Sequence, residues 1–534
     1  MLDLNKEEAA TPEKTIAQND QEQTDVPEIE YPTPFKLALI VLIICVAGFL
    51  CGLDQTILAA AVPKITNDFQ ALGDIACLTS ATLQLVYGRL YSLFSIKLVY
   101  IGALFVFGVG SLLCTLAQNS ITLVVSRAIS GCGAAGIFSG NVLVLAASCP
   151  LEKRPGLSGL IFSSVGLASV AGPFIGGALT DGVTWRWCFG VNLPLVALII
   201  TGVCFFVRIS VNEGTKQLNW GEKAKRFDIP GTLILSASLV SFILALQLGG
   251  SKYPWGSARV IILFVISGLV FCGFVALQVF VPTQRSFPVS IIRNRNVLLA
   301  TFVNGFISSG LFVQITYLPV WFQAVKNASA LRSGVMICPM IIAFVVMCAV
   351  SGGVTQRIGY YNPAMIFGAV FSAIGGGLLS TFNVNTASSK WVGYQILYGL
   401  GAGAGVPPCV LVIQTVLSTE DIPLGVSLTN LFQMLWSSIA VATAQTIFGN
   451  ELAKGIAAVI PGFDVRGLSY TGASHLAIIY SPSQLENVVP IYSTAIGKTF
   501  LITASLGCVG LFCALGLQWK SMKKTVAEGE VSAN

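Results

Sequence analysis

Two charged side chains, Asp54 and Arg127, lie inside long apolar stretches of this 534-residue chain. A charge within a hydrocarbon layer costs at least ~2.5–3.5 kcal/mol, so an unpaired one needs a role. Burial disfavours the carboxylate form, so Asp54 could take up a proton at one face of a membrane and release it at the other. A guanidinium keeps its proton, so Arg127 could hold that acid, bind a substrate oxygen or tie helices together. We therefore predict a translocation site here, with both groups facing one water-accessible cavity.

Each of these positions also has a structural explanation. Asp54 could be a helix-end aspartate that reaches the water interface, and Arg127 could be a structural cation bound to backbone carbonyls. Which explanation holds depends on the elements that carry the two residues.

The composition is that of a protein with many membrane-spanning segments. Hydrophobic residues make up 54% of the chain and charged residues 10%, against ~25% charged in an average soluble protein. The mean hydropathy is +0.79. A helix needs ~20 apolar residues to cross a bilayer, and about fourteen stretches qualify: 36–62, 75–96, 98–117, 121–146, 157–180, 187–207, 229–248, 258–281, 297–322, 333–354, 363–382, 391–418, 424–449 and 494–518.

The charges predict how these spans are oriented. Residues 1–35 hold nine carboxylates and two lysines, which is typical of a disordered, acidic cytosolic tail. With that tail in the cytosol, 19 lysines and arginines fall on the inner side and ten on the outer. This bias agrees with the positive-inside rule and accounts for the basic surplus without a nucleic-acid partner.

The spacing of the spans predicts an all-α protein of two six-helix bundles with two extra helices between them. We place the first bundle at 36–210, a cytosolic loop at 211–228, the extra helices at 229–281, and the second bundle at 297–518. The second bundle includes a long external loop at 450–493, and a cytosolic tail follows at 519–534. The loops at 88–97 and 353–360 both begin with glycine and carry a cation, which favours two related halves.

Two groups of residues could serve movement between these halves. Gly88, Arg89 and Lys97 could form a cytosolic gate by binding helix C-termini or carboxylates, although loop cations also simply orient the chain. In span 5, small residues at helical spacing form a flat face for close packing, and a proline bends the helix. These residues are Gly166, Gly172, Pro173, Gly176 and Gly177.

Polar side chains in the second half could line a cavity of mixed polarity, although some amides will only join helices. The candidates are Asn304, Tyr317, Gln323, Gln395, Gln414 and Gln433. Asn327 begins the sequon Asn-Ala-Ser in a loop that we place outside, so it is a candidate for glycosylation. The fourteen cysteines are scattered without metal-site spacing, and we expect neither a metal nor a cofactor.

An ordered set of motifs across nearly all of 36–520 resembles the major facilitator superfamily. Within it, the chain is similar to the 14-span drug:proton antiporters, and more narrowly to the fungal toxin and multidrug efflux branch. The matching segments are 53–57 with 61–63, 127–136, 166–177, 185–194, 227–231, 249–255 and 317–325. The segment 166–177 resembles the fifth-helix antiporter motif, which is the most specific of them for export.

This resemblance implies a proton-driven antiporter that exports small amphipathic compounds such as fungal secondary metabolites, toxins or drugs. Asp54 and Arg127 would then take part in proton coupling. We expect a monomer in the plasma membrane, with a vacuolar membrane as the alternative. The resemblance also implies no ATP hydrolysis. The chain contains no Gly-x-x-x-x-Gly-Lys-Ser/Thr phosphate loop, in agreement with that expectation.

The chain departs from the family pattern in three places. Ser92, Ser95 and Ile96 stand where the second-loop motif carries an aspartate and a Gly-Arg pair, which argues against an acid-based latch within that loop. Span 2 is short, because 14 residues separate Asp74 from Arg89, ~21 Å of helix. Three explanations stay open: the helix runs past Arg89, a real deletion impairs the protein, or the gene model lost a few codons. Gly190 replaces an expected tryptophan.

Three other functions compete with export. A siderophore or vacuolar basic amino acid transporter shares this architecture, but a carrier of cations should hold several intramembrane acids. A membrane-embedded oxidase needs histidine clusters, whereas His475 is the one histidine, so we do not expect an enzyme. A non-transporting sensor of the same fold would tolerate Asp54→Asn and Arg127→Ala, whereas a coupled pump would lose transport.

Overall fold

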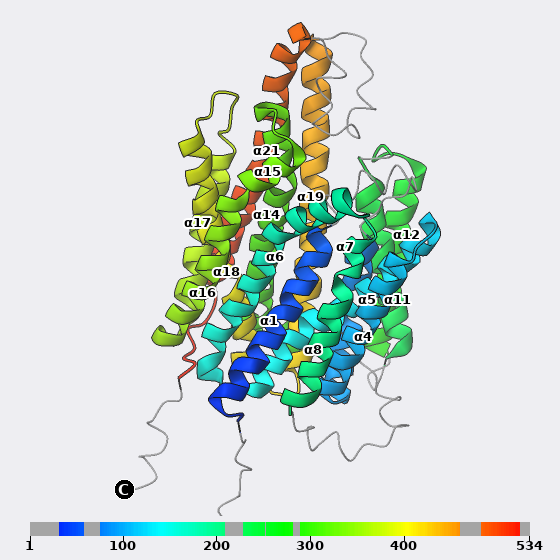
Figure 1. The fold of residues 1–534 in the computed structure, drawn as a ribbon, viewed down its shortest axis with the longest axis vertical. Helices are drawn as coiled ribbons and strands as arrows, with labels where there is room; N and C mark the ends of the chain where they lie inside the picture. The colour runs from blue at the N-terminus through cyan, green and yellow to red at the C-terminus, as the bar shows by residue number, and fades with distance from the viewer. Residues whose placement is uncertain are drawn as a thin grey trace, which may run out of the picture.

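The computed structural model describes residues 31–57, 75–208, 228–250, 253–280, 289–459 and 482–523. In these ranges the chain is built from α-helices, with one isolated bridge between Gly249 and Tyr253. Figure 1 shows the long helices running roughly parallel, with the start of α1 and the last described residues after α21 at the same face. We call this the terminal face, and the opposite one the distal face. Predictions for 1–30, most of the loop 211–228, His475 and 524–534 fall outside the described residues.

The first bundle is formed by the helices before residue 207. They are α1 (Pro34–Thr56), α3 (Ile75–Leu93), α4 (Ile96–Thr115), α5 (Ser120–Ser148), α6 (Arg154–Gly182), α7 (Trp187–Gly190) and α8 (Asn192–Phe206). Local sequence sets their ends: the side chain of Asn119 caps α5 by accepting from Thr122 N at 2.7 Å, and a proline lies in the first turn of α1 and α6.

The second bundle follows the two extra helices. The extra pair is α11 (Ile229–Leu248) and α12 (Ala258–Phe280). The second bundle contains α13 (Val289–Arg293), α14 (Arg295–Lys326), α15 (Ala330–Met336), α16 (Cys338–Ile358), α17 (Asn362–Leu379), α18 (Ser388–Val416), α19 (Ile422–Val459) and α21 (Pro482–Leu515). The predicted fold class, two six-helix bundles plus two helices, is confirmed.

Thirteen helices in the described ranges are long and apolar enough to cross a membrane, and α3 is not among them. Its composition is too polar, and it packs between α5, α11 and α19. Its Ser80 and Gln84 are almost fully buried and bond to Gly131 O and Ser139 Oγ. With α3 as the fourteenth, the number of spans agrees with the expected total of about fourteen.

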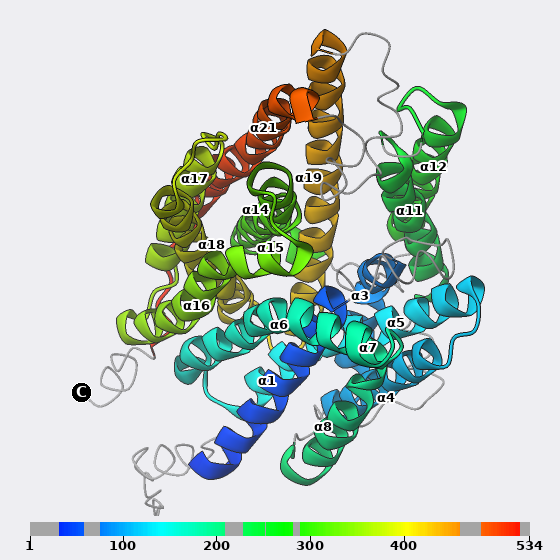
Figure 2. The same ribbon diagram turned by 45° about the horizontal axis from the view of Figure 1, so that its top comes forward.

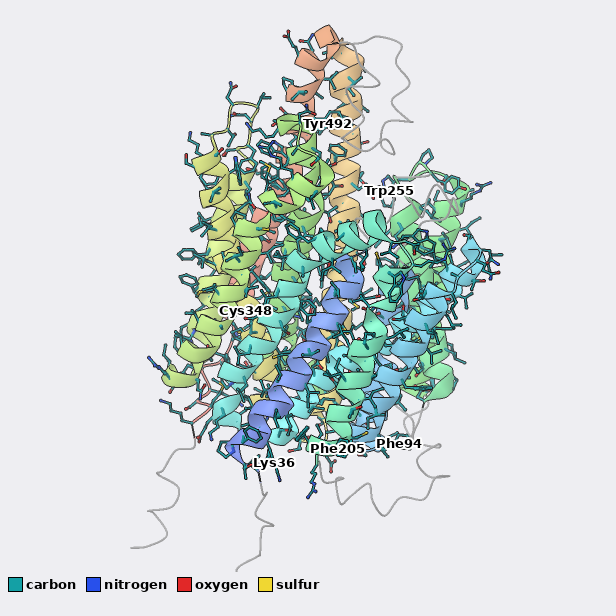
Figure 3. The ribbon with its side chains drawn as sticks, in the orientation of Figure 1. Lys36, Phe94, Phe205, Trp255, Cys348 and Tyr492 are labelled. Atoms are coloured by element: carbon teal, nitrogen blue, oxygen red, sulfur yellow. The ribbon has the colours of Figure 1, made fainter. Side chains whose placement is uncertain are left out.

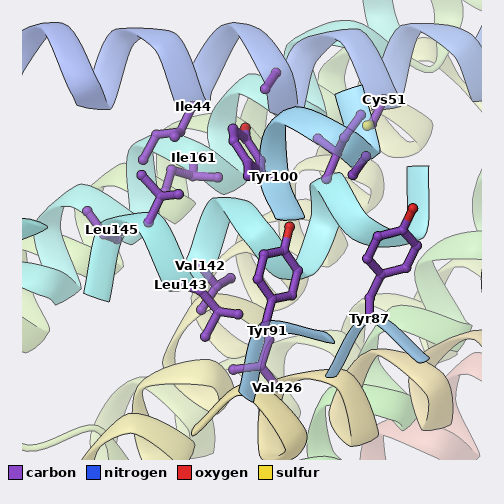
Figure 4. Packing of buried hydrophobic residues seen from close by; sticks show 14 of the residues in the cluster. Ile44, Cys51, Tyr87, Tyr91, Tyr100, Val142, Leu143, Leu145, Ile161 and Val426 are labelled. Atoms are coloured by element: carbon purple, nitrogen blue, oxygen red, sulfur yellow. The ribbon is translucent and has the colours of Figure 1, made fainter. Parts of the chain in front are cut away.

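Each bundle has its own apolar core, and the first is built around tyrosines. In Figure 4 Tyr87 and Tyr91 of α3 and Tyr100 of α4 point into the space between the helices. Tyr100 Oη donates to Asn141 Oδ1 at 2.5 Å, and Tyr91 Oη donates to Gly136 O at 2.8 Å. These two buried hydroxyls are thus paired within the core.

The bundles meet along two helix pairs, α6 with α16 and α3 with α19. Figure 2 shows α11 and α12 on the side of α3 and α19, away from α16 and α17. Figure 3 places Lys36, Phe94 and Phe205 near the terminal face, and Trp255 and Tyr492 toward the distal face. Large apolar side chains remain exposed on the outer helices, as expected where lipid is the solvent.

The prediction of an external loop at 450–493 is wrong at both ends. Helix α19 continues to Val459, and α21 already begins at Pro482. Apolar side chains of the two extensions, among them Leu452, Ile456 and Val488, pack into a separate cluster. The prediction assumed that each helix ends where the membrane ends. The two helices instead continue further, because their extensions pack against each other.

Candidate functional site

Asp54 and Arg127 form a buried ion pair within the first bundle. Arg127 Nη1 donates to both carboxylate oxygens, at 2.9 Å to Oδ1 and 2.8 Å to Oδ2. Asp54 lies in the last turn of α1 and Arg127 in the second turn of α5, and the two residues are 3% and 8% exposed. Hydrogen bonds between a guanidinium and a carboxylate at these distances join α1 to α5 by a charge-assisted pair.

Polar and aromatic neighbours complete the surroundings of this pair. Asn192 Nδ2, at the start of α8, lies 3.3 Å from Asp54 Oδ1 and 3.4 Å from Ser111 Oγ of α4. The guanidinium carbon of Arg127 lies 5.4 Å from the centre of the Phe189 ring. Four elements (α1, α4, α5 and the α7–α8 corner) therefore enclose the pair. Asn192 was missed in the sequence, although an amide at the start of an apolar stretch was the available signal.

The prediction that both charged groups line a shared cavity is wrong for this conformation. Successive residues of a helix point about 100° apart. Neighbouring residues in the last turn of α1 therefore face different surroundings. Asp54 points into the first bundle, whereas Gln55 lines a cavity between the bundles. The pair thus lies one residue from the cavity wall but inside the packed helices.

The cavity has a volume of ≈ 260 Å³ and lies toward the distal face, close to the ~300 Å³ at which small-molecule sites begin. It is lined by amides, hydroxyls and apolar groups, and no charged side chain is among its described residues. These are Gln55, Phe138, Leu246, Gln247, Phe312, Thr316, Asn430, Gln433, Met434, Ser437, Ser438, Val441, Ala442 and Gln445. They come from α1, α5, α11, α14 and α19.

At the terminal face the bundles are in direct contact. Ser139 Oγ of α5 and Ser427 Oγ of α19 lie 3.3 Å apart. A Cβ atom on Gly88 would lie 2.8 Å from Ser427 Oγ. Arg154 Nη1 of α6 donates to Gln414 Oε1 of α18 at 3.4 Å. The two halves are therefore closed together at this end, and the cavity lies on the other side of the closure.

The predicted gate residues have separate positions. Gly88 lies at the contact between the halves, as described above. Arg89 interacts electrostatically with Asp228, which caps α11, and with Asp421, which precedes α19. Lys97 instead donates to Cys204 O at the end of α8, 2.7 Å away, so it binds a helix C-terminus within its own bundle. The loop after α3 lacks the aspartate of the family motif, but Asp228 and Asp421 from other parts of the chain provide negative charge near Arg89.

The candidate cavity residues of the second half divide into two groups. Gln433 lines the cavity, and Asn304 Nδ2 donates to Gln433 Oε1 at 3.0 Å. The other four lie elsewhere: Tyr317 is buried beside Phe448, Gln323 donates to Ser333, Gln395 is fully buried, and Gln414 bonds Arg154. On α14 the cavity face carries Phe312 and Thr316. Tyr317 points from another face of that helix, whereas Gln323 lies on the same face but about two turns beyond Thr316.

The small residues of α6 contact two different neighbours. A Cβ atom on Gly166 would lie 2.7 Å from Val345 of α16, in the other bundle, whereas one on Gly172 would collide with Thr56 of α1. Gly177 has nothing within 4 Å, and Gly176 O accepts from Cys188 Sγ at 3.8 Å. Pro173 lies within the helix beside Gly334. Close packing of α6 therefore depends on Gly166 and Gly172.

Two further predictions concern the surface and metals. Asn327 ends α14 in the left-handed conformation (φ 49°), with its side chain exposed beyond the distal end of that helix. It is therefore accessible, and its glycosylation stays a prediction. In the described ranges, no group of three or more histidine, cysteine, aspartate or glutamate side chains could hold a metal ion.

Comparisons with known proteins agree with this architecture. The chain is 44% identical over 505 residues to the thioclapurine efflux transporter of Claviceps purpurea, covering 93% of each chain. It is 38% identical over 503 residues to the rubrofusarin-specific efflux pump of Gibberella zeae, covering 93% of this chain and 92% of that one. It is also 38% identical to an efflux pump of Arthroderma benhamiae, covering 95% and 96%.

Solved structures show the same fold at low sequence identity. The human organic anion transporter MFSD10 superposes with a TM-score of 0.58 at 13% identity, over 90% of this chain and 100% of that one. The proton:xylose symporter XylE gives 0.57 at 16% identity, over 94% and 99%. The sequence model of the Major Facilitator Superfamily matches residues 44–441 of this chain. With two bundles closed at one face around an intervening cavity, this chain belongs to the Major Facilitator Superfamily.

Proposed function

We propose that the protein is a proton-coupled exporter of small amphipathic organic compounds, such as fungal secondary metabolites, toxins or drugs. The observation that carries this proposal is the cavity between the bundles, whose amides and hydroxyls alternate with Phe138, Phe312 and Met434. A site of this composition binds a largely apolar molecule and orients it by a few hydrogen bonds. Relatives named for the efflux of thioclapurine and rubrofusarin support the same substrate class.

The relatives named for efflux support outward transport, and the distribution of lysine and arginine supports the placement of the terminal face in the cytosol. The contacts of Ser427 with Ser139 and Gly88 then close the cytosolic side, and the cavity faces outward. An exporter releases its substrate from this state. The cavity and the ion pair are both built within one chain, which supports a monomer, and we propose the plasma membrane as its location.

Coupling to protons would use the Asp54–Arg127 pair. Taking up a proton at Asp54 removes one charge of the pair and leaves Arg127 buried without its counter-ion, a costly state. The bonds at 2.8–2.9 Å that join α1 to α5 would then weaken. Since Gln55 follows Asp54 on α1 and lines the cavity, a rearrangement of the pair changes the cavity wall directly.

The alternative substrate classes find less support in the cavity. A basic amino acid carries a fixed positive charge, and its burial without a carboxylate partner is expensive. The described lining of the cavity contains no aspartate or glutamate. The structure therefore favours uncharged amphipathic compounds over a basic amino acid; nothing in it favours a siderophore.

The test uses yeast that lacks its own drug exporters and expresses this chain or an empty vector. Cycloheximide, a neutral amphipathic toxin with hydroxyl and carbonyl groups, is the probe. We expect lower accumulation of labelled cycloheximide in cells with the protein, and a return to the empty-vector level on addition of a protonophore. Equal accumulation in both strains would overturn export, and a protonophore-insensitive difference would overturn proton coupling.

A further inference from the structure

The extra helix α11 is fixed against both bundles rather than lying free in the lipid. Its Ile243 packs with Ala81 of α3, and Met434 and Leu435 of α19 pack against the same cluster. Beyond its distal end, Trp255 Nε1 donates to Thr446 Oγ1 of α19 at 3.1 Å. Helix α12 differs, because only 17% of the residues in its most apolar 18-residue segment are buried. The two extra helices therefore have unequal roles.

The tight turn between the extra helices sets the height at which α11 ends. Gly250 adopts φ +70°, a conformation that side chains rarely allow. Gly250 N donates to Tyr253 O at 2.9 Å, and Tyr253 N donates to Leu248 O at 3.0 Å. This turn brings Trp255 against Gly249 and onto α19. The last turn of α11 is thereby held beside the distal part of α19.

At that position the last turn of α11 forms a wall of the cavity. Leu246 and Gln247 line it together with Gln55 of α1 and Gln445 of α19. Gln445 directly precedes Thr446, the acceptor of the Trp255 bond, so the same contact fixes both amides relative to each other. Three amides from three separate elements thus contribute to one uncharged cavity.

We propose that Gln247 is a specificity-determining residue, through which α11 selects uncharged substrates that carry hydroxyl or carbonyl groups. A primary amide both donates and accepts hydrogen bonds, so it matches either group. It offers no countercharge, so a cation entering the cavity would be desolvated without compensation. This inference rests on the proposed export function and assigns a role to a helix outside the two six-helix bundles.

The first experiment tests the geometry without requiring transport. Gln247→Cys and Ile262→Cys are expressed in yeast, and intact cells are treated with a membrane-impermeant biotin maleimide. Ile262 lies in the second turn of α12, the helix that follows α11, and its side chain is 54% exposed but is not among the residues that line the cavity. The unmodified chain, with its fourteen cysteines, gives the background. Maleimides react with thiolates, which form in water and not in lipid.

We expect biotin on the Gln247→Cys protein above background and none on the Ile262→Cys protein. Excess cycloheximide should slow the labelling, since it would occupy the same cavity. Equal labelling of both variants, or no labelling of Gln247→Cys, would overturn the placement of α11 in the cavity wall. This result does not depend on export, so it separates a failure of this inference from a failure of the proposed function.

The second experiment measures selectivity with cycloheximide and the permanent cation ethidium. Gln247→Leu should reduce cycloheximide export about fivefold, the effect of one lost hydrogen bond. Gln247→Glu should raise the ratio of ethidium to cycloheximide export about tenfold or more, because the carboxylate supplies a countercharge. Ile262→Ala should leave the ratio unchanged. An unchanged ratio in Gln247→Glu would overturn the role of this residue in specificity, and a wild-type chain that exports neither compound would overturn the proposed function itself.

Discussion

Removing one member of the Asp54–Arg127 pair should cost far more stability than removing both. The side chains of Arg127 and Asp54 are 9% and 5% exposed, and their closest N–O distance is 2.8 Å. Asp54→Asn keeps the shape of the side chain but leaves the guanidinium buried without a countercharge. Breaking a buried pair in this way costs about 3–5 kcal/mol, whereas replacing both members by neutral groups is often close to neutral.

The two single variants should also differ in their response to pH. In Arg127→Gln the unpaired carboxylate of Asp54 can become neutral by taking up a proton, so its destabilisation should shrink as the pH falls. In Asp54→Asn the guanidinium of Arg127 cannot lose its proton, so the destabilisation should stay the same. Asn192 Nδ2, 3.3 Å from Asp54 Oδ1, can still bond an amide at position 54. This bond keeps the local geometry of the Asp54→Asn variant close to that of the wild type.

The assay is equilibrium unfolding by sodium dodecyl sulfate in mixed micelles, with four proteins in a double-mutant cycle. We expect losses of about 3–5 kcal/mol for each single variant at neutral pH and within about 1 kcal/mol of wild type for Asp54→Asn with Arg127→Gln. Single variants within 1 kcal/mol of wild type would show that the pair is not buried as described. Equal pH responses of the two single variants would refute the electrostatic reasoning.

Two further predictions compare matched glycines, and a third concerns Asn327. The added methyl group of Gly172→Ala would collide with Thr56, so this variant should lower the unfolding free energy by about 1–3 kcal/mol. In the control Gly177→Ala the added methyl group meets nothing within 4 Å, so the unfolding free energy should change by less than about 0.5 kcal/mol. Similar losses in the two variants would argue against the packing of α6 on α1. Gly88→Leu should hold the bundles apart at the terminal face, so it should abolish export of cycloheximide while the protein still reaches the membrane. In the control Gly102→Leu the new side chain begins in open space, so export should be normal. Normal export by Gly88→Leu would contradict the closure of the terminal face. Asn327→Gln should remove any glycosidase-sensitive increase in mass, and a sensitive band that persists in the variant would place the glycan elsewhere.

Much of the fold could be predicted from the length of the apolar stretches, because a bilayer sets the length of a spanning helix. This rule fails where protein replaces lipid. Helix α3 carries Ser80 and Gln84 in buried hydrogen bonds, so its hydropathy is too low for a span by composition alone. It fails again at Val459 and Pro482, where two helices support one another beyond the expected end of the membrane.

The candidate site was predictable in its residues but not in its geometry. The cost of burying a charge was enough to single out Asp54 and Arg127, and they form a pair. Which way a side chain faces depends on the rotation of its helix, and a step of one residue separates Asp54 in the bundle from Gln55 in the cavity. The role of Gln247 depends on the docking of α11 against α19, a contact between segments distant in sequence.

The measurement that tests the central claim most directly is transport by the purified protein in liposomes that contain a pH-sensitive dye. An imposed pH gradient should drive labelled cycloheximide toward the acidic side, and cycloheximide should in turn release protons into the alkaline compartment. The folded double variant of Asp54 and Arg127 should bind cycloheximide without moving protons. Gradient-driven uptake by that variant equal to wild type, or uptake by the wild type that ignores the gradient, would contradict coupling through this pair.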